Sequence, residues 1–281
     1  MTRRMSQTAT LRRFAFACLA AVSIGSVTPG GLPNSAAQSR RVERAPQSRG
    51  RVRMVADTTR YPWSSICKII ATFPDETTVE GTGTMIGPPH CLTALHLLYD
   101  AKTHASAARV RIVPGYDDER LLTRGLSSHP FGTAHVNQFL FWEPHDIAVI
   151  VTSSNIGDLS SWMTVGARTD RELLGPSYLL GGYTSTPTGS ERQSNLTALI
   201  TRVDHDRLTL NSEAVNGLDG GPIFQRQARG RQGEQDIWTI VGVQTGAGRG
   251  SRIPAEMRRI LDRFLHDDFA GVNAKIPVPT R

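Results

Sequence analysis

The chain of 281 residues has few of the residue patterns that point to metal or cofactor chemistry. Aromatic residues make up 6% of it and cysteine occurs three times. The eight histidines are scattered, with neither a pair at i, i+4 nor cysteine partners at zinc spacing, so we expect no metal site. The stretch Gly81-Thr82-Gly83-Thr84 lacks the lysine of a phosphate-binding loop and is typical of close strand packing. We therefore expect no cofactor.

Positive charge is concentrated at one end of the chain. The first 60 residues contain eleven arginines, no lysine and two acids, a net +9, so the rest carries −2 of the total +7. Because the basic excess belongs to a tail, we expect no nucleic-acid footprint on the folded body. The stretch Arg40-Arg41-Val42-Glu43-Arg44 is typical of a solvated, disordered segment.

Long apolar runs are also scarce, with one exception near the N-terminus. Four arginines in the first 13 residues precede an uncharged apolar run over Phe14–Val27, and Ser35-Ala36-Ala37 offers small residues for cleavage. The run is short for a membrane span. We expect residues 1–37 to be a signal peptide and the protein to be secreted or periplasmic, without stable membrane insertion after cleavage. A retained membrane anchor is the alternative interpretation.

The rest of the chain is predicted to form one β-rich domain, preceded by a linker. Residues 38–59 are polar and Arg-rich, which predicts a basic linker or pro-segment. Short β-like runs separated by turn residues then predict an all-β sandwich or barrel. A helical apolar spacing after Pro254 predicts a helix over about 254–266, and residues 271–281 form a tail. The predicted strands are Ile66–Phe73, Thr78–Ile86, Arg109–Val113, Ile147–Val151, Tyr178–Gly182, Leu196–Val203, Arg207–Leu210 and Trp238–Gln244.

Three segments in order point to a peptidase. They are Gly83–Pro88 with Cys91–His96, then His145–Ile150, then Asn216–Phe224, and they resemble the histidine, aspartate and nucleophile segments of the trypsin-like serine peptidases. This resemblance covers about 61–269. It implies a domain over 60–270 with two antiparallel six-stranded β-barrels, about 61–158 and about 166–250. It also implies a site between the barrels and a C-terminal helix packed on the second one.

The resemblance assigns roles to individual residues. His96 takes the place of the catalytic base and Asp146 that of the carboxylate that orients it. The backbone N–H groups of Gly217 and Asp219 take the place of the oxyanion hole. The serine is missing, since Asp219 stands in the nucleophile position.

The match is nearest to the glutamyl-endopeptidase branch, which Arg111–Tyr116, Leu180–Tyr183 and Val241–Gly246 resemble. Two residues depart from that branch. Its substrate-recognising histidine is replaced by Gln244, and a threonine before the nucleophile by Ala214. Because glutamine cannot carry a positive charge toward a carboxylate, we do not expect specificity for glutamate. The specificity pocket is expected to contain Ala214, Gln244, Thr245 and Gly246.

The aspartate at position 219 leaves three interpretations open. A carboxylate is a poor nucleophile toward amides, it repels a developing oxyanion, and it raises the pKa of a neighbouring histidine. The chain is then a non-catalytic peptidase homologue that binds a peptide or protein. Alternatively, it is a serine-type endopeptidase with residual or rescued activity, or a hydrolase that forms an ester on Asp219.

The cysteines and the oligomeric state complete the expectations. Cys18 lies within the signal peptide, so Cys67 and Cys91 remain in the exported chain. They either form a disulfide, as exported proteins often do, or stay as two small buried thiols. We expect a monomer whose partner is a peptide or protein.

Overall fold

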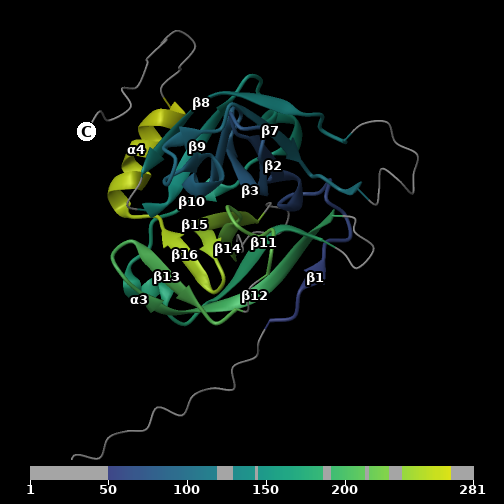
Figure 1. Ribbon diagram of the computed structural model, residues 1–281. Coiled ribbons are helices and arrows are strands. Elements are labelled where there is room, and N and C mark those ends of the chain that lie inside the picture. Colours follow the sequence, from purple (N-terminus) through teal and green to yellow (C-terminus); the bar gives the residue numbers. More distant parts are fainter. Residues whose placement is uncertain are drawn as a thin grey trace, which may run out of the picture. The chain divides into compact units, whose positions relative to one another are not determined.

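The computed structural model describes residues 50–118, 129–142, 145–185, 191–212, 215–227 and 236–266. The predicted signal peptide, most of the predicted linker, Ala214 and the tail over 271–281 lie outside the described residues. The rest forms two closed, six-stranded antiparallel β-barrels followed by a helix, so the expected fold class is confirmed (Figure 1).

The first barrel is made by the N-terminal half of the described chain. Its strands close in the order β2-β3-β4-β9-β8-β7. They are β2 (Ile66–Thr72), β3 (Thr78–Gly87), β4 (His90–Thr93), β7 (Arg109–Pro114), β8 (Ala134–Trp142) and β9 (Ile147–Thr152). The short elements around them are η1 (Trp63–Ser65), η2 (Leu95–Leu97), β5 (Tyr99–Asp100), β6 (Ala105–Ser106) and α2 (Gly157–Ser160).

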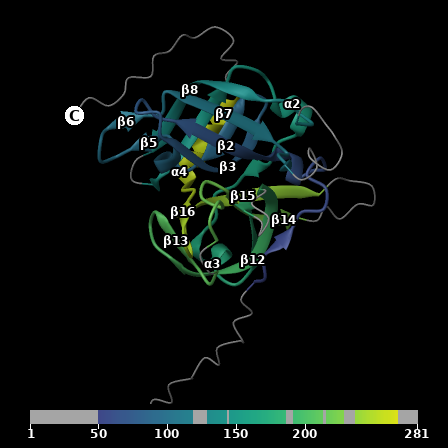
Figure 2. The same cartoon turned by 45° about the vertical axis from the view of Figure 1, so that its right-hand side comes forward.

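The second barrel follows in the sequence and lies beside the first (Figures 1 and 2). Its strands run in the order β12-β11-β14-β15-β16-β13, and pairing of β12 with β13 closes the ring. They are β11 (Ser177–Ser185), β12 (Glu191–Val203), β13 (Arg207–Leu210), β14 (Pro222–Gln227), β15 (Ile237–Gly246) and β16 (Arg249–Arg252). The short elements are β10 (Thr164–Val165), which pairs with β15, and α3 (Asp170–Leu173).

Strand alternation divides the core into three parts. On β2, Cys67, Ile69 and Ala71 point into the first barrel, as the two-residue period of a strand requires. Ile66, on the other face of the same strand, belongs to a cluster that joins the two barrels. A third cluster fills the second barrel. Burial on both faces of β2 holds the barrels together and places the site residues at their junction.

Two features at the ends of the domain go beyond what was expected from the sequence. The predicted linker contains a strand, β1 (Arg53–Met54), which pairs with β12, and Val55 after it is buried. An unpaired edge of β12 is thereby covered. The helix α4 (Ala255–His266) forms where predicted, but it reaches the first barrel, since Leu265 lies against Gly87 of β3. Ile260 of this helix is 47% exposed.

The two cysteines are free thiols in the structure, and both are fully buried. Cys67 is on β2 and Cys91 on β4, with β3 between them. Burial, and after it a hydrogen bond and charge from Cys91, raise the pKa of the Cys67 thiol, so the two thiols are neighbours. Of the two alternatives considered from the sequence, the structure has the two buried thiols, and the Cys91 sulfur lies over Gly83 of the strand between them.

Among the described residues, no helix is long and apolar enough to cross a membrane.

Candidate active site

The histidine of the site follows directly after a strand of the first barrel. β4 ends at Thr93, and the 3₁₀ turn η2 carries His96 between two buried leucines, Leu95 and Leu97. These leucines anchor the turn in the barrel, while the His96 side chain remains 40% exposed. Packing therefore fixes the backbone of His96 and leaves its ring accessible to a ligand.

Asp146 directly precedes β9 and lies beside this histidine. Its Oδ2 lies 2.8 Å from Nδ1 of His96, and its Oδ1 accepts the backbone N–H of His96 at 2.9 Å. Asp146 has a φ of +47°, in the left-handed region that aspartate tolerates better than most residues. Both oxygens of Asp146 thus hold His96, and the pairing expected from the sequence is present.

The loop that carries Asp219 is held from both barrels. Its backbone turns at Gly217 and Gly220, where φ is +88° and +82°. A Cβ at Gly217 would lie 1.8 Å from the carbonyl oxygen of Tyr183, and one at Gly220 would lie 2.2 Å from that of Thr82. Only glycine fits either position, so the glycines of the motif serve the loop geometry.

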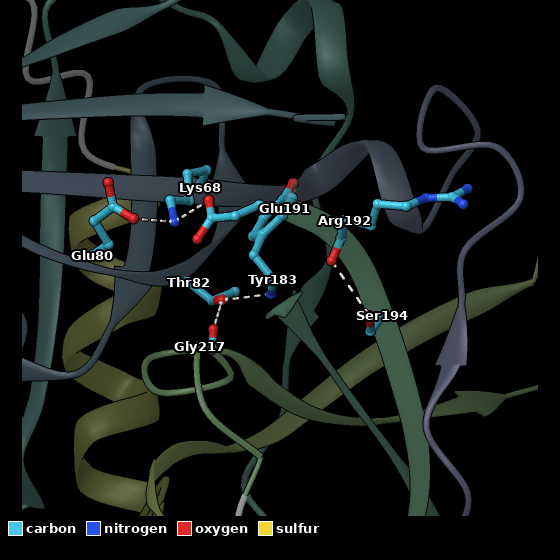
Figure 3. A network of polar contacts seen from close by, with 8 residues as sticks. All are labelled: Lys68, Glu80, Thr82, Tyr183, Glu191, Arg192, Ser194 and Gly217. Atoms are coloured by element: carbon cyan, nitrogen blue, oxygen red, sulfur yellow. Dashed lines mark hydrogen bonds and ion pairs between the residues drawn. The ribbon is translucent and has the colours of Figure 1, made fainter. Parts of the chain in front are cut away.

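Thr82 of β3 connects this loop to the first barrel. Its hydroxyl donates to the carbonyl of Gly217 at 2.7 Å and accepts the N–H of Tyr183 at 3.2 Å (Figure 3). Its backbone N–H donates to the carbonyl of Asp219 at 2.8 Å. Sequence analysis assigned no site role to this threonine. The position of this threonine between two glycines of a predicted strand could have indicated its role.

The N–H groups assigned to the oxyanion hole are those of Gly217 and Asp219. Neither donates a hydrogen bond to any of the described residues. The loop is held instead through the carbonyls of both residues, by Thr82. Both donors are consequently available to an oxygen atom of a ligand.

Charge at the site favours a protonated histidine. Burial disfavours the charged ring, but the hydrogen bond and charge of Asp146, with the charge of Asp219, outweigh it and raise the pKa of His96. Burial also raises the pKa of Asp219, while the charge of His96 lowers it and that of Asp146 raises it further. Asp219 therefore contributes to raising the pKa of His96, in the direction expected from the sequence.

Gln244 lies behind the loop. It is buried, its backbone carbonyl accepts the N–H of Gly220 and its N–H donates to Gly221, each at 2.8 Å. Its side-chain Nε2 lies 3.5 Å from the carbonyl oxygen of Gly181. Gln244 thus supports the loop from the second barrel. Thr245 and Gly246 follow it half-buried, and the proposed pocket formed with Ala214 stays a prediction.

A buried lysine lies at the same junction of the barrels. Lys68 of β2 is 3% exposed and forms an ion pair with Glu80 of β3 at 2.8 Å and another with Glu191 of β12 (Figure 3). The two carboxylates are 47% and 22% exposed. Sequence analysis did not select this group, although a lysine within the apolar run Ile66–Ile70 was a signal. Because a buried charge requires a partner, Lys68 ties the barrels together.

Among the described residues, no three or more His, Cys, Asp or Glu side chains lie together in a group that could hold a metal ion.

One curated protein is similar to the chain over part of its length. No protein-family model matches the chain. Glutamyl endopeptidase of Bacillus licheniformis is 25% identical over 182 residues, which are 62% of this chain and 52% of that protein. The chain is similar to glutamyl endopeptidase over this part of both sequences. It matches about half the length of this curated relative.

One solved structure supports the fold. A Glu endopeptidase in complex with MPD has a TM-score of 0.61 and 24% identity, and the match covers 77% of this chain and 97% of that one. Protease Anisep from Arthrobacter nicotinovorans has a TM-score of 0.46 and 16% identity, with 73% and 93% covered. The fold is therefore that of the trypsin-like serine peptidases, as the three sequence motifs predicted.

Proposed function

We propose that the chain is an exported relative of glutamyl endopeptidase that has lost peptidase activity and binds a peptide or protein at the retained site. The observation that carries this proposal is Asp219, which stands in the nucleophile position on a loop otherwise held as the motif requires. The proposed export depends on the predicted signal peptide over 1–37, and we expect the exported chain to be a monomer.

The chemical argument concerns the first step of amide hydrolysis. A serine hydroxyl gives its proton to the histidine and attacks the carbonyl carbon. Asp219 has no hydroxyl proton to give, and attack by its carboxylate would form a reactive anhydride. Its charge also opposes an oxyanion at the N–H groups of Gly217 and Asp219. The raised pKa of His96 further reduces the fraction of neutral ring that could act as a base.

Binding a peptide requires fewer groups than hydrolysing it, and the groups that binding requires are retained. Two backbone donors, an accessible His96 ring and a rigid loop offer hydrogen bonds to a peptide carbonyl. We infer that glutamate is not selected, because Gln244 is neutral and its amide is directed toward Gly181.

One observation favours a second candidate function. The contact of 2.8 Å between His96 and Asp146 is intact, although a pure binding protein does not require it. A serine-type endopeptidase with residual activity, not specific for glutamate, is the function that this pair supports.

Replacing Asp219→Ser separates the two functions. The substitution supplies a hydroxyl, removes the charge at the oxyanion donors and lets His96 become neutral. We expect the wild-type chain to leave a peptide library uncleaved and not to react with a fluorophosphonate serine probe. The serine variant is expected to label and to hydrolyse peptides, and Asp219→Ala serves as the inactive control. Equal hydrolysis by the wild type and the serine variant would refute the inactive assignment.

A further inference from the structure

A cavity of about 480 Å³ opens beside His96 on the surface of the first barrel. Its apolar wall contains Phe73, Val79, Tyr99 and Ala105, and His96 is part of its lining. The volume falls within the range of about 300–1,000 Å³ typical of ligand pockets. A ligand held at His96 therefore has an apolar cavity within its reach.

Two short turns build the walls, and each is held by its own hydrogen bonds. In the turn between β2 and β3, Phe73 donates its N–H to the carbonyl of Thr77 at 2.9 Å, and Asp75 accepts the Thr77 hydroxyl at 2.6 Å. In the turn after β5, Asp100 accepts the N–H of Lys102 at 2.8 Å and the hydroxyl of Thr103 at 2.7 Å. A pocket with internally bonded walls loses little conformational freedom when it binds.

Aromatic stacking supports one wall from behind. The ring of Tyr99 stacks on that of Phe141 of β8, with the centroids 6.2 Å apart and the planes 10° apart. Its hydroxyl also lies 3.0 Å from Nδ1 of His104. The aromatic wall is thereby anchored to the barrel rather than to the loop alone.

The rim of the cavity carries negative charge. Asp75 and Asp100 belong to the lining, and Lys102 is the one lysine or arginine in it among the described residues. Hydrogen bonds from Thr77 lower the pKa of Asp75, and the N–H of Lys102 together with the Thr103 hydroxyl lowers that of Asp100. Both carboxylates are ionised at neutral pH, and Asp146 and Asp219 add negative charge at the adjacent site.

We propose that this cavity receives a large apolar side chain of the bound peptide, and that its acidic rim selects a neighbouring lysine or arginine in that peptide. The proposal rests on the function proposed above, since it names the sequence that the site recognises. Shape and charge together distinguish this ligand from an acidic peptide, which the carboxylates repel.

A pair of small molecules tests the cavity without a peptide. Tryptamine and indole-3-acetate share the indole ring and carry opposite charge, so their comparison isolates the rim. By NMR, we expect tryptamine to shift the amide signals of Ala101, Thr103 and Ala105, with affinity about tenfold above that of indole-3-acetate. Absence of these shifts, or equal affinity for both molecules, would overturn the proposal.

Filling the cavity should remove this binding. Ala105→Trp and, as a second variant, Ala101→Trp place an indole in or over the cavity, and we expect tryptamine affinity to fall about tenfold or more. Ala108→Trp is the matched control, because Ala108 is exposed and not part of the lining. Asp75→Asn with Asp100→Asn retains acceptor oxygens for the turns and should abolish the preference for the cation. Thermal melting confirms that each variant folds.

Selection from a displayed random peptide library connects the cavity to function. We expect the full chain to enrich peptides with Trp, Phe, Tyr or Leu beside Lys or Arg, and Ala105→Trp to lose them. Peptides that bind equally well to Ala105→Trp would overturn the cavity proposal and leave the binding function standing. If tryptamine binds as expected but no peptide is selected, the proposed binding function fails while the cavity remains a site for apolar cations.

Discussion

Asp146 holds His96 through both of its carboxylate oxygens, one on the ring nitrogen Nδ1 at 2.8 Å and one on the backbone N–H at 2.9 Å. The two contacts fix the ring and its backbone relative to β9. Asp219 contributes a second negative charge to the same ring. The histidine therefore lies in the field of two anions, an arrangement that stabilises the imidazolium more than it prepares a base.

The first prediction concerns titration of His96. NMR should give a pKa above the ordinary value of about 6.5. Asp219→Asn should lower it, and Asp146→Asn should lower it more, because Asp146 supplies a hydrogen bond as well as charge. Since the folded pKa is raised, the stability that His96 contributes is fully present below about pH 6.5 and is lost as pH rises through the folded pKa. A pKa below 6.5 would mean that burial outweighs both aspartates.

The second prediction concerns Thr82, which is fully buried. Thr82→Val keeps the shape but leaves the carbonyl of Gly217 and the N–H of Tyr183 without their partner. We expect the free energy of unfolding in urea to fall by about 2–4 kcal/mol. Thr201→Val is the control, because its hydroxyl also donates to a carbonyl but the residue is exposed. An effect at Thr82 no larger than at Thr201 would contradict the bridging role.

The third prediction concerns Lys68. Lys68→Met leaves the carboxylates of Glu80 and Glu191 together without their cation, and we expect a loss of about 2–3 kcal/mol in unfolding free energy. This loss in unfolding free energy is smaller than for a fully buried ion pair, because Glu80 is 47% exposed to solvent. Adding Glu191→Gln to Lys68→Met should recover part of the loss. The exposed Lys102→Met should change stability by less than about 0.5 kcal/mol, and a similar loss there would disprove the role of Lys68.

The fourth prediction concerns the cysteines. Because Cys67 and Cys91 are free and fully buried, a thiol reagent should modify neither in the native protein and both after unfolding. Burial raises the pKa of the Cys67 thiol, which slows its reaction further. A reducing agent should leave the melting temperature unchanged. Detection of a disulfide between Cys67 and Cys91 by mass spectrometry would contradict the free state of the two thiols.

Strand prediction from sequence succeeded where one face of a strand is apolar. All eight predicted strands are present, including β2, β9 and β15. β8 was missed, because its sequence Ala-His-Val-Asn-Gln followed by Phe-Leu-Phe-Trp has no uniform alternation. β16 is four residues long and too short to show a period. β1 was missed because two residues carry no period, and only pairing with β12 makes them a strand.

From the sequence alone came the order of the motifs, the expected pair of His96 and Asp146, and the prediction that Asp219 takes the place of the nucleophile serine. Those features are local, since each depends on residue type and spacing within one segment. Tertiary structure decided which distant groups meet: Thr82 with Gly217, Lys68 with Glu191, and the turns of the first barrel around the cavity beside His96. The closing of two barrels and their packing set these distances, and no pattern within a single segment encodes them. Likewise, only the tertiary structure brings Cys67 and Cys91 together as neighbouring free thiols from strands on either side of β3.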